Sequence, residues 1–262
     1  FYYPHLVVEM MVDQVTILSL SLFGGFTIFI LNLLGAVPVL FLNKISQKIL
    51  DVGLGFAAGV MLGASFTSLI VPGIAYGGVF PVIVGILIGS LTVALTDKFV
   101  PHLHFLIGRE GVSSKVKAVW LFLIAIILHN APEGLVVGIG FGTGNLDAAY
   151  ALMWAIGLQN MPEGLSVGFS FLSTGKYSRK KAFMLSTLSG LIEVPLAVLG
   201  GLSMTISQNL VPFAMGFGAG AMIFVISDEI IPETHRIGHE KLASYGLVVG
   251  LIVMLLLDTV LG

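Results

Sequence analysis

The chain has 262 residues, of which 56% are hydrophobic and only 10% are charged. Soluble domains contain about 25% charged residues, so this composition excludes a soluble globular protein and indicates an integral membrane protein in contact with the lipid bilayer. The net charge of −2 offers no basic surface for nucleic acid, and the absence of cysteine excludes disulfides and thiolate metal sites.

Apolar runs follow one another along the whole chain. A membrane-spanning helix needs about 20 mostly apolar residues. Runs of this kind occupy residues 15–42, 53–74, 79–96, 116–141, 149–172, 182–203, 212–231 and 243–261. The connections between them are short. We therefore expect an all-α integral membrane protein with eight transmembrane helices, in which residues 1–262 form a single transmembrane domain.

The basic residues predict the orientation of these helices. All 12 Lys and Arg residues lie in, or at the edge of, the connections that follow the first, third, fifth and seventh runs. Cytoplasmic loops collect Lys and Arg. Both termini are therefore predicted to lie outside the cytoplasm, in the cell (inner) membrane if the source is bacterial.

Two internal repeats predict a 3+2+3 arrangement. Residues 129–135 (His-Asn-Ala-Pro-Glu-Gly-Leu) match residues 159–165 (Gln-Asn-Met-Pro-Glu-Gly-Leu) in the next span, which runs in the opposite direction. A shift of 161 residues aligns spans one to three with spans six to eight and places Asn32 on Glu193. Inverted repeats around a midplane site are typical of transporters. For the longer shift, chance similarity between Gly-rich helices remains an alternative.

Polar side chains gather near the middle of spans four, five and six. They are His129, Asn130, Glu133, Gln159, Asn160, Glu163 and Glu193. A charged side chain at that depth costs at least ~2.5–3.5 kcal/mol. Since no Lys or Arg lies at this depth, the glutamates must be either protonated or neutralised by a bound cation.

The spacing of these residues favours the cation. His129 and Glu133 stand four residues apart and share one helical face, and Gln159 and Glu163 repeat the spacing. Pro132 lacks the N–H group that would bond four residues back, which frees a backbone carbonyl. Imidazole, carboxylate and amide donors suit Zn²⁺, Fe²⁺ or Mn²⁺.

Other interpretations explain less of the pattern. A structural kink with Asn and Gln as interhelical hydrogen-bond partners leaves the three glutamates unexplained. A proton relay explains the carboxylates but needs no histidine beside them. An intramembrane metal-dependent hydrolase or oxidase would use the same buried ligands, yet the chain has neither a His-Glu-x-x-His nor a Glu-x-x-His motif. No P-loop motif is present, so no nucleotide partner is expected.

Residues 129–134 and 159–164 resemble the paired signature motifs of the ZIP (Zrt/Irt-like protein) family of divalent-metal transporters. Residues 227–236 resemble the end of that family's seventh helix. The resemblance covers essentially the whole chain and implies metal uptake into the cytoplasm, without enzymatic activity, through a midplane site that is often binuclear. It assigns the seven buried polar residues to this site and adds Met61, which the sequence alone favours as a packing residue. It leaves the oligomeric state open, with a homodimer as one alternative.

Further acidic and histidine residues stand near the predicted ends of the route. At the cytoplasmic end they are Asp97, His102 and His104, just beyond span three, and Asp228, Glu229, Glu233, His235 and His239, at the end of span seven and just beyond it. The second group is predicted to bind metal at the exit, with His235 and His239 on one face if that stretch is helical. For His102 and His104, solvated loop residues are an equal alternative. Asp258 is predicted to lie at the outer entrance.

Overall fold

The computed structural model describes residues 4–99, 112–206, 208–235 and 238–261, and within them every regular element is a helix. The predicted all-α class is thereby confirmed. The elements are α1 (Pro4–Ala36), η1 (Val37–Leu40), α2 (Gln47–Ala64), η2 (Ser65–Ile70), α3 (Val71–Gly77), α4 (Val79–Phe99), α5 (Val112–Gly142), α6 (Leu146–Ser173), α7 (Arg179–Gly190), α8 (Glu193–Ile206), η3 (Gln208–Leu210), α9 (Val211–Val225), η4 (Ile226–Ile230), α10 (Ile231–Thr234) and α11 (Glu240–Leu261).

Seven helical stretches in the described residues are long and apolar enough to cross a membrane. They correspond to the predicted spans one to four and six to eight. The predicted fifth span lies in α6, whose 28 residues are also long enough to cross. Its polar residues Gln159, Asn160 and Glu163 lower its mean hydropathy, so that α6 differs from the other seven in composition and not in length.

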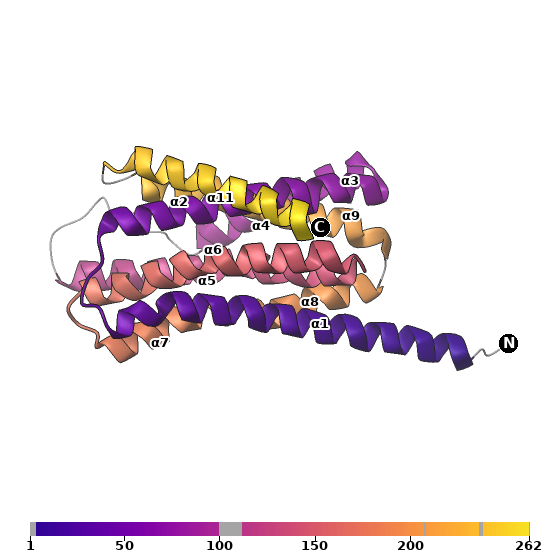
Figure 1. Cartoon of the computed structure of the whole chain (residues 1–262), viewed down its shortest axis with the longest axis horizontal. Coiled ribbons are helices and arrows are strands. Elements are labelled where there is room, and N and C mark those ends of the chain that lie inside the picture. Colours follow the sequence, from indigo (N-terminus) through magenta and orange to yellow (C-terminus); the bar gives the residue numbers. More distant parts are fainter. Residues whose placement is uncertain (1–3, 100–111, 207, 236–237, 262) are drawn as a thin grey trace.

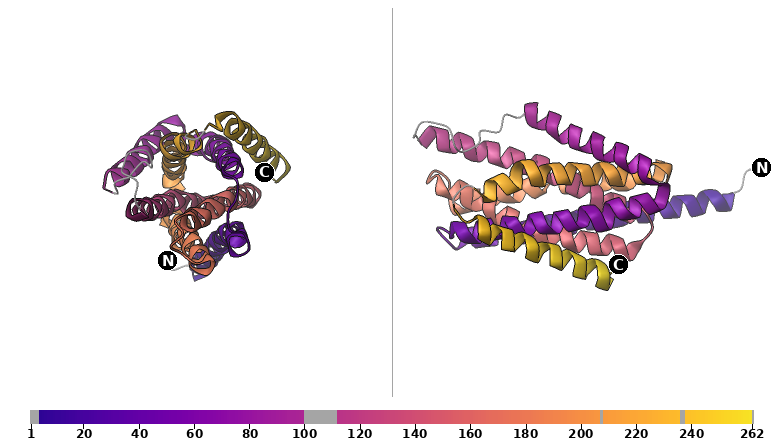
Figure 2. Two further views of the ribbon diagram at one scale, coloured as in Figure 1. Left: turned by 90° about the vertical axis from the view of Figure 1, so that its left-hand side faces the viewer. Right: turned by 90° about the horizontal axis from the view of Figure 1, so that it is seen from above.

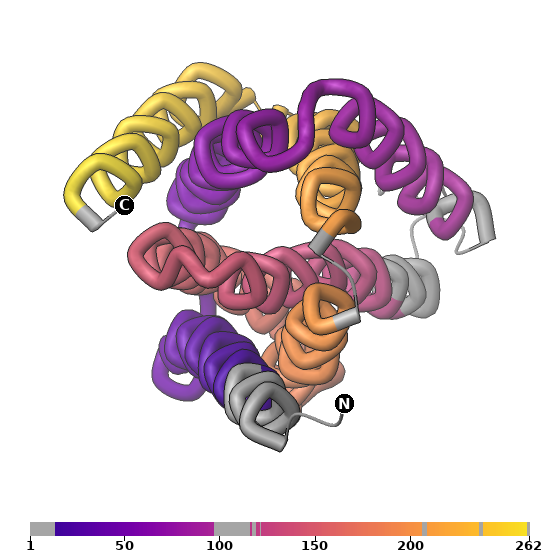
Figure 3. The backbone as a smooth tube through the Cα atoms, turned by 90° about the vertical axis from the view of Figure 1, so that its right-hand side faces the viewer, coloured from indigo at the N-terminus to yellow at the C-terminus, as the bar shows by residue number. Residues whose placement is uncertain are grey.

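The helices lie in three tiers around α5 and α6. They run roughly along one common direction, and the start of α1 and the end of α11 lie toward the same end of the bundle (Figure 1). Viewed end-on, α5 and α6 form the middle tier, with α1 and α8 on one side and α2, α4, α9 and α11 on the other (Figures 2 and 3). The two helices that carry the repeated motif are therefore covered on two sides by the rest of the protein.

Glycine permits close packing in the outer tier. A Cβ atom on Gly59 of α2 would lie only 2.8 Å from the backbone carbonyl carbon of Leu247 in α11. A Cβ atom on Gly220 of α9 would lie equally close to the carbonyl carbon of Ile86 in α4. Only a residue without a side chain allows these backbones to approach so closely.

Two segments that carry polar residues of the predicted metal route depart from regular α-helical geometry. The predicted span 182–203 is not continuous: α7 ends at Gly190 and α8 begins at Glu193. Pro195 has no N–H group to bond the carbonyl of Leu191, which explains the interruption. The stretch Ile226–Ile230 is π-helical, a geometry frequent at functional sites.

Candidate metal centre

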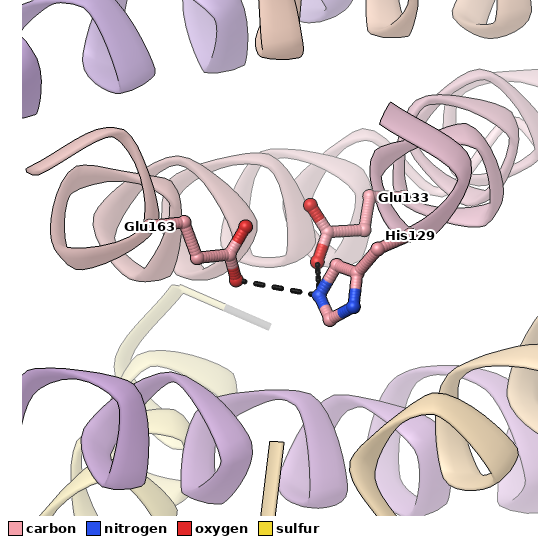
Figure 4. A group of neighbouring side chains, drawn as sticks. All are labelled: His129, Glu133 and Glu163. Carbon is pink, nitrogen blue, oxygen red and sulfur yellow. Dashed lines mark ion pairs between the residues drawn. The ribbon is translucent and has the colours of Figure 1, made fainter. Parts of the chain in front are cut away.

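Three titratable side chains meet between α5 and α6. His129 and Glu133 project from α5 and Glu163 from α6 toward one point (Figure 4). His129 Nε2 lies 3.5 Å from Glu133 Oε1 and 3.4 Å from Glu163 Oε1. One ligand atom from each residue lies within 4.8 Å of the other two, and all three side chains are buried. An imidazole nitrogen with two carboxylates is a donor set suited to a divalent cation.

Buried amides hold the carboxylates in place. Gln159 Nε2 donates a hydrogen bond to Glu133 Oε1, which joins the two repeated motifs. Asn160 Nδ2 donates to Glu193 Oε1 over 2.6 Å, and Asn130 Nδ2 donates to the carbonyl of Ser189 over 3.1 Å. Each amide thus uses its nitrogen on a protein acceptor.

The strongest sign of a cation site is a set of buried side-chain oxygens that have no hydrogen-bond donor in the described part of the chain. Within the described residues, the following side-chain oxygens of this cluster are buried and accept no hydrogen bond: Asn130 Oδ1, Glu133 Oε2, Gln159 Oε1, Asn160 Oδ1, Glu163 Oε1 and Oε2, and Glu193 Oε2. Nor do the three glutamates pair with any Lys or Arg in that part of the chain. Buried oxygens without donors are costly unless water or a cation neutralises them.

Local sequence explains why Glu193 reaches this cluster. Gly134 follows Glu133 directly, and a Cβ atom on Gly134 would lie 2.6 Å from Cα of Glu193. The absence of a side chain at position 134 therefore lets the start of α8 lie against α5. Sequence reasoning placed Glu193 halfway along an unbroken helix, whereas it is the first residue of α8. Pro195 was the signal that pointed to this break.

The other face of His129 borders a cavity of about 230 Å³ between α4, α5, α8 and α9. Glu229 also lines this cavity, and its Oε2 lies 3.9 Å from Nδ1 of His129. The prediction that Glu229 stands with Asp228 at the cytoplasmic exit is wrong in this respect. Asp228 is exposed, whereas Glu229 reaches inward from the π-helical stretch to the central histidine.

The predicted exit histidines do not share a helical face. Helix α10 ends at Thr234, and Nδ1 of His235, the next residue, lies 2.8 Å from the carbonyl of Ile231 at the start of α10. His239 Nδ1 instead lies 2.8 Å from Oδ2 of Asp51, which α2 contributes. Asp51 is buried and also accepts a hydrogen bond from Gln47. Sequence reasoning missed Asp51, although a carboxylate directly before an apolar run was a usable signal.

The other predicted site residues are Met61 and Asp258, whose side chains the structure describes, and Asp97, whose side chain it does not. Met61 is fully buried within the apolar core. Asp258 is near the end of α11, and its Oδ1 lies 3.4 Å from the Ser68 hydroxyl. Asp97 lies in the last turns of α4, but its side chain is outside the described residues, and so are His102 and His104 as a whole.

Comparison with known proteins agrees with this geometry. A family model described as ZIP zinc transporter matches residues 107–258. The zinc transporter ZIPB of Bordetella bronchiseptica is 42% identical over 256 residues, covering 92% of this chain and 81% of that protein. The zinc transporter GufA of Myxococcus xanthus is 37% identical over 87% of this chain and 94% of its own.

A human protein is similar as well. The zinc transporter ZIP11 of Homo sapiens is 32% identical over 92% of this chain and 97% of its own. These relatives are transporters, so the alternative of an intramembrane hydrolase or oxidase is set aside. Because the family model matches more than half of the chain and the relatives align with most of it, the chain belongs to the ZIP family of zinc transporters.

Proposed function

We propose that this protein carries zinc across the membrane into the cytoplasm through the buried cluster on α5, α6 and α8. The observation that carries the proposal is the convergence of His129, Glu133 and Glu163 within 4.8 Å in an interior without Lys or Arg partners among the described residues. Nitrogen and carboxylate donors suit zinc, and the aligned relatives are named zinc transporters. Iron, manganese and cadmium are further substrates to test.

A second metal position beside the first would use the remaining oxygens. Asn160 and Glu193 are hydrogen-bonded to each other, yet each keeps one buried oxygen without a donor. Glu133 and Glu163 also keep buried oxygens without a donor among the described residues. These free acceptors support a binuclear site in which Glu133 and Glu163 bridge the two ions.

The whole chain, in this proposal, forms one transport domain with eight spans and both termini outside. Corresponding glycine contacts support the inverted repeat. Gly59 packs on Leu247 and Gly220 on Ile86, and a shift of 161 residues converts one pair into the other. α6, though more polar than the seven other spans, crosses with them because its polar face is buried inside the bundle.

The route to and from the site would use the outlying polar residues. Asp258 stands near the end of α11, where we propose the outer entrance. Asp228 lies in η4, and His235 and His239 lie in the connection that leads from α10 to the start of α11. Asp97 lies in the last turns of α4. We propose that these four residues accept the metal on its way to the cytoplasm.

Reconstitution tests the proposal. Purified protein in liposomes that contain a zinc-sensitive dye is expected to admit zinc, whereas Glu133→Ala and Glu163→Ala are each expected to reduce uptake to the level of empty liposomes. Glu240→Ala provides a matched control because Glu240 is exposed and remote in sequence from the cluster. Wild-type uptake by a folded Glu163→Ala protein would contradict the proposed site.

A further inference from the structure

The imidazole of His129 faces two different environments. Its Nε2 atom lies toward Glu133 and Glu163, at 3.5 and 3.4 Å. Its Nδ1 atom lies toward Glu229 on the π-helical stretch of a different helix, at 3.9 Å from Oε2. The ring thus stands between the carboxylates of the proposed site and a fourth carboxylate beside the cavity.

Metal binding through Nε2 dictates where the ring proton goes. A neutral imidazole binds a metal through one nitrogen and carries its proton on the other. Because Nε2 is the atom that faces Glu133 and Glu163, the proton must reside on Nδ1. The His129 side chain is only 1% exposed, so leaving this N–H group without an acceptor would be costly.

Glu229 is the anionic acceptor that the cavity offers. Its other polar lining residues, besides His129, are Thr92 and Thr96. Both are neutral hydroxyls that donate to carbonyls of their own helix, those of Ile88 and Thr92, and a carboxylate is the stronger acceptor for an imidazole N–H group. The Glu229 side chain is 19% exposed and lines the cavity, so it has room to rotate. Such a rotation can shorten the distance between its Oε2 atom and Nδ1 of His129 from 3.9 Å to about 2.9 Å, the length of a hydrogen bond.

We infer that Glu229 is a positioning residue for the metal site: it accepts the Nδ1 proton of His129 and holds Nε2 toward Glu133 and Glu163. The inference rests on the proposed function, because it assumes that the cluster binds zinc. A carboxylate that accepts the second N–H of a metal-binding histidine fixes both the tautomer and the ring orientation, and its loss typically weakens metal binding about 10–100-fold.

Zinc titration of the purified protein in detergent tests the size of this effect. Glu229→Ala is expected to weaken zinc binding about 10–100-fold. Glu229→Gln is expected to recover most of the affinity, because its amide oxygen still accepts a hydrogen bond while the charge is lost. Glu240→Ala, which removes an exposed carboxylate, is expected to leave the affinity unchanged.

Nuclear magnetic resonance of protein labelled with ¹⁵N-histidine tests the tautomer directly. The His129 signals are assigned by their loss in His129→Gln. In the zinc-bound wild type, we expect a protonated Nδ1 and a metal-bound Nε2. In zinc-bound Glu229→Ala the Nδ1–H signal of His129 is expected to shift or to be lost, whereas a purely structural role for Glu229 would leave it unchanged. The comparison therefore separates positioning from general support of the fold.

The outcomes distinguish this inference from the proposed function. If the wild type binds no zinc, the proposed function itself fails. If the wild type binds zinc but Glu229→Ala binds it equally well, or if zinc is bound through Nδ1, only the positioning role is overturned. A Glu229→Gln protein as weak as Glu229→Ala also overturns it. Should Glu229→Ala not fold, Glu229→Gln and the wild-type spectrum still decide.

Discussion

Asn160 of α6 donates a hydrogen bond of 2.6 Å from its side-chain amide to Oε1 of Glu193, the first residue of α8. Both side chains are fully buried. The bond uses the nitrogen of Asn160 and one oxygen of Glu193, and it leaves Asn160 Oδ1 and Glu193 Oε2 without donors among the described residues. This pair is therefore where the proposed second metal position can be tested.

Replacing Asn160 by Asp is expected to make the zinc-free protein less stable and to raise its affinity for zinc. Asn160→Asp exchanges the donor for a second carboxylate against Glu193, which costs about 1–3 kcal/mol when no cation is bound. The added anionic ligand should strengthen zinc binding roughly tenfold, or about 1.4 kcal/mol. Melting temperatures with and without zinc, combined with a zinc titration, measure both effects. Unchanged affinity and stoichiometry would argue against Asn160 as a ligand.

Acidification is expected to weaken zinc binding. Imidazole and carboxylate groups must be unprotonated to bind a metal, so protons compete with zinc at His129, Glu133 and Glu163. The affinity should fall by up to about tenfold per pH unit for each proton displaced as the pH is lowered from neutral to mildly acidic.

Calorimetry in buffers of different ionisation enthalpy reports the number of protons released by zinc. His129→Gln serves as the comparison, because it lacks one protonatable ligand and should release fewer protons. A binding enthalpy that does not depend on the buffer, with an affinity that does not depend on pH, would contradict the prediction. Proton release on binding does not require net proton antiport.

Asp51 is expected to stabilise the contact between α2 and the start of α11. Asp51→Ala deprives Gln47 and His239 of their shared acceptor at 2.8 Å. The free energy of unfolding should fall by about 1–3 kcal/mol, which lowers the melting temperature by several degrees. Asp51→Asn keeps one acceptor oxygen and should lose less. Glu240→Ala, at an exposed carboxylate, should change the melting temperature little. Equal melting temperatures for Asp51→Ala and the wild type would refute this role.

Gly59 is expected to tolerate no side chain. A Cβ atom at this position lies 2.8 Å from both the carbonyl carbon of Leu247 and the amide nitrogen of Leu251, which are backbone atoms and cannot move aside. Gly59→Ala should therefore destabilise the protein by about 1–3 kcal/mol or more. In Gly140→Ala the nearest atom is the terminal Cδ2 of Leu152 at 3.3 Å, so a much smaller loss is expected. Thermal melts of both variants would reveal a difference, and equal stability would show that α2 can move away from α11.

The amino-acid sequence by itself determined the class of protein and the residues of the central cluster. Polar and charged residues are costly inside a bilayer, so His129, Glu133 and Glu163 stand out in apolar runs, and their helical spacing assigns them to shared faces. Even the partnership of α5 with α6 is visible in the sequence, because the repeated motif recurs after only 30 residues.

Contacts between distant segments were decided by the tertiary structure. Glu229 meets His129 across 100 positions of sequence, and Asp51 meets His239 across 188. Such contacts depend on how the helices pack and where a helix is interrupted, as before Glu193. The periodicity of a single helix determines which residues share a face but carries no information about the helix that will cover it. That information arises only when the helices assemble.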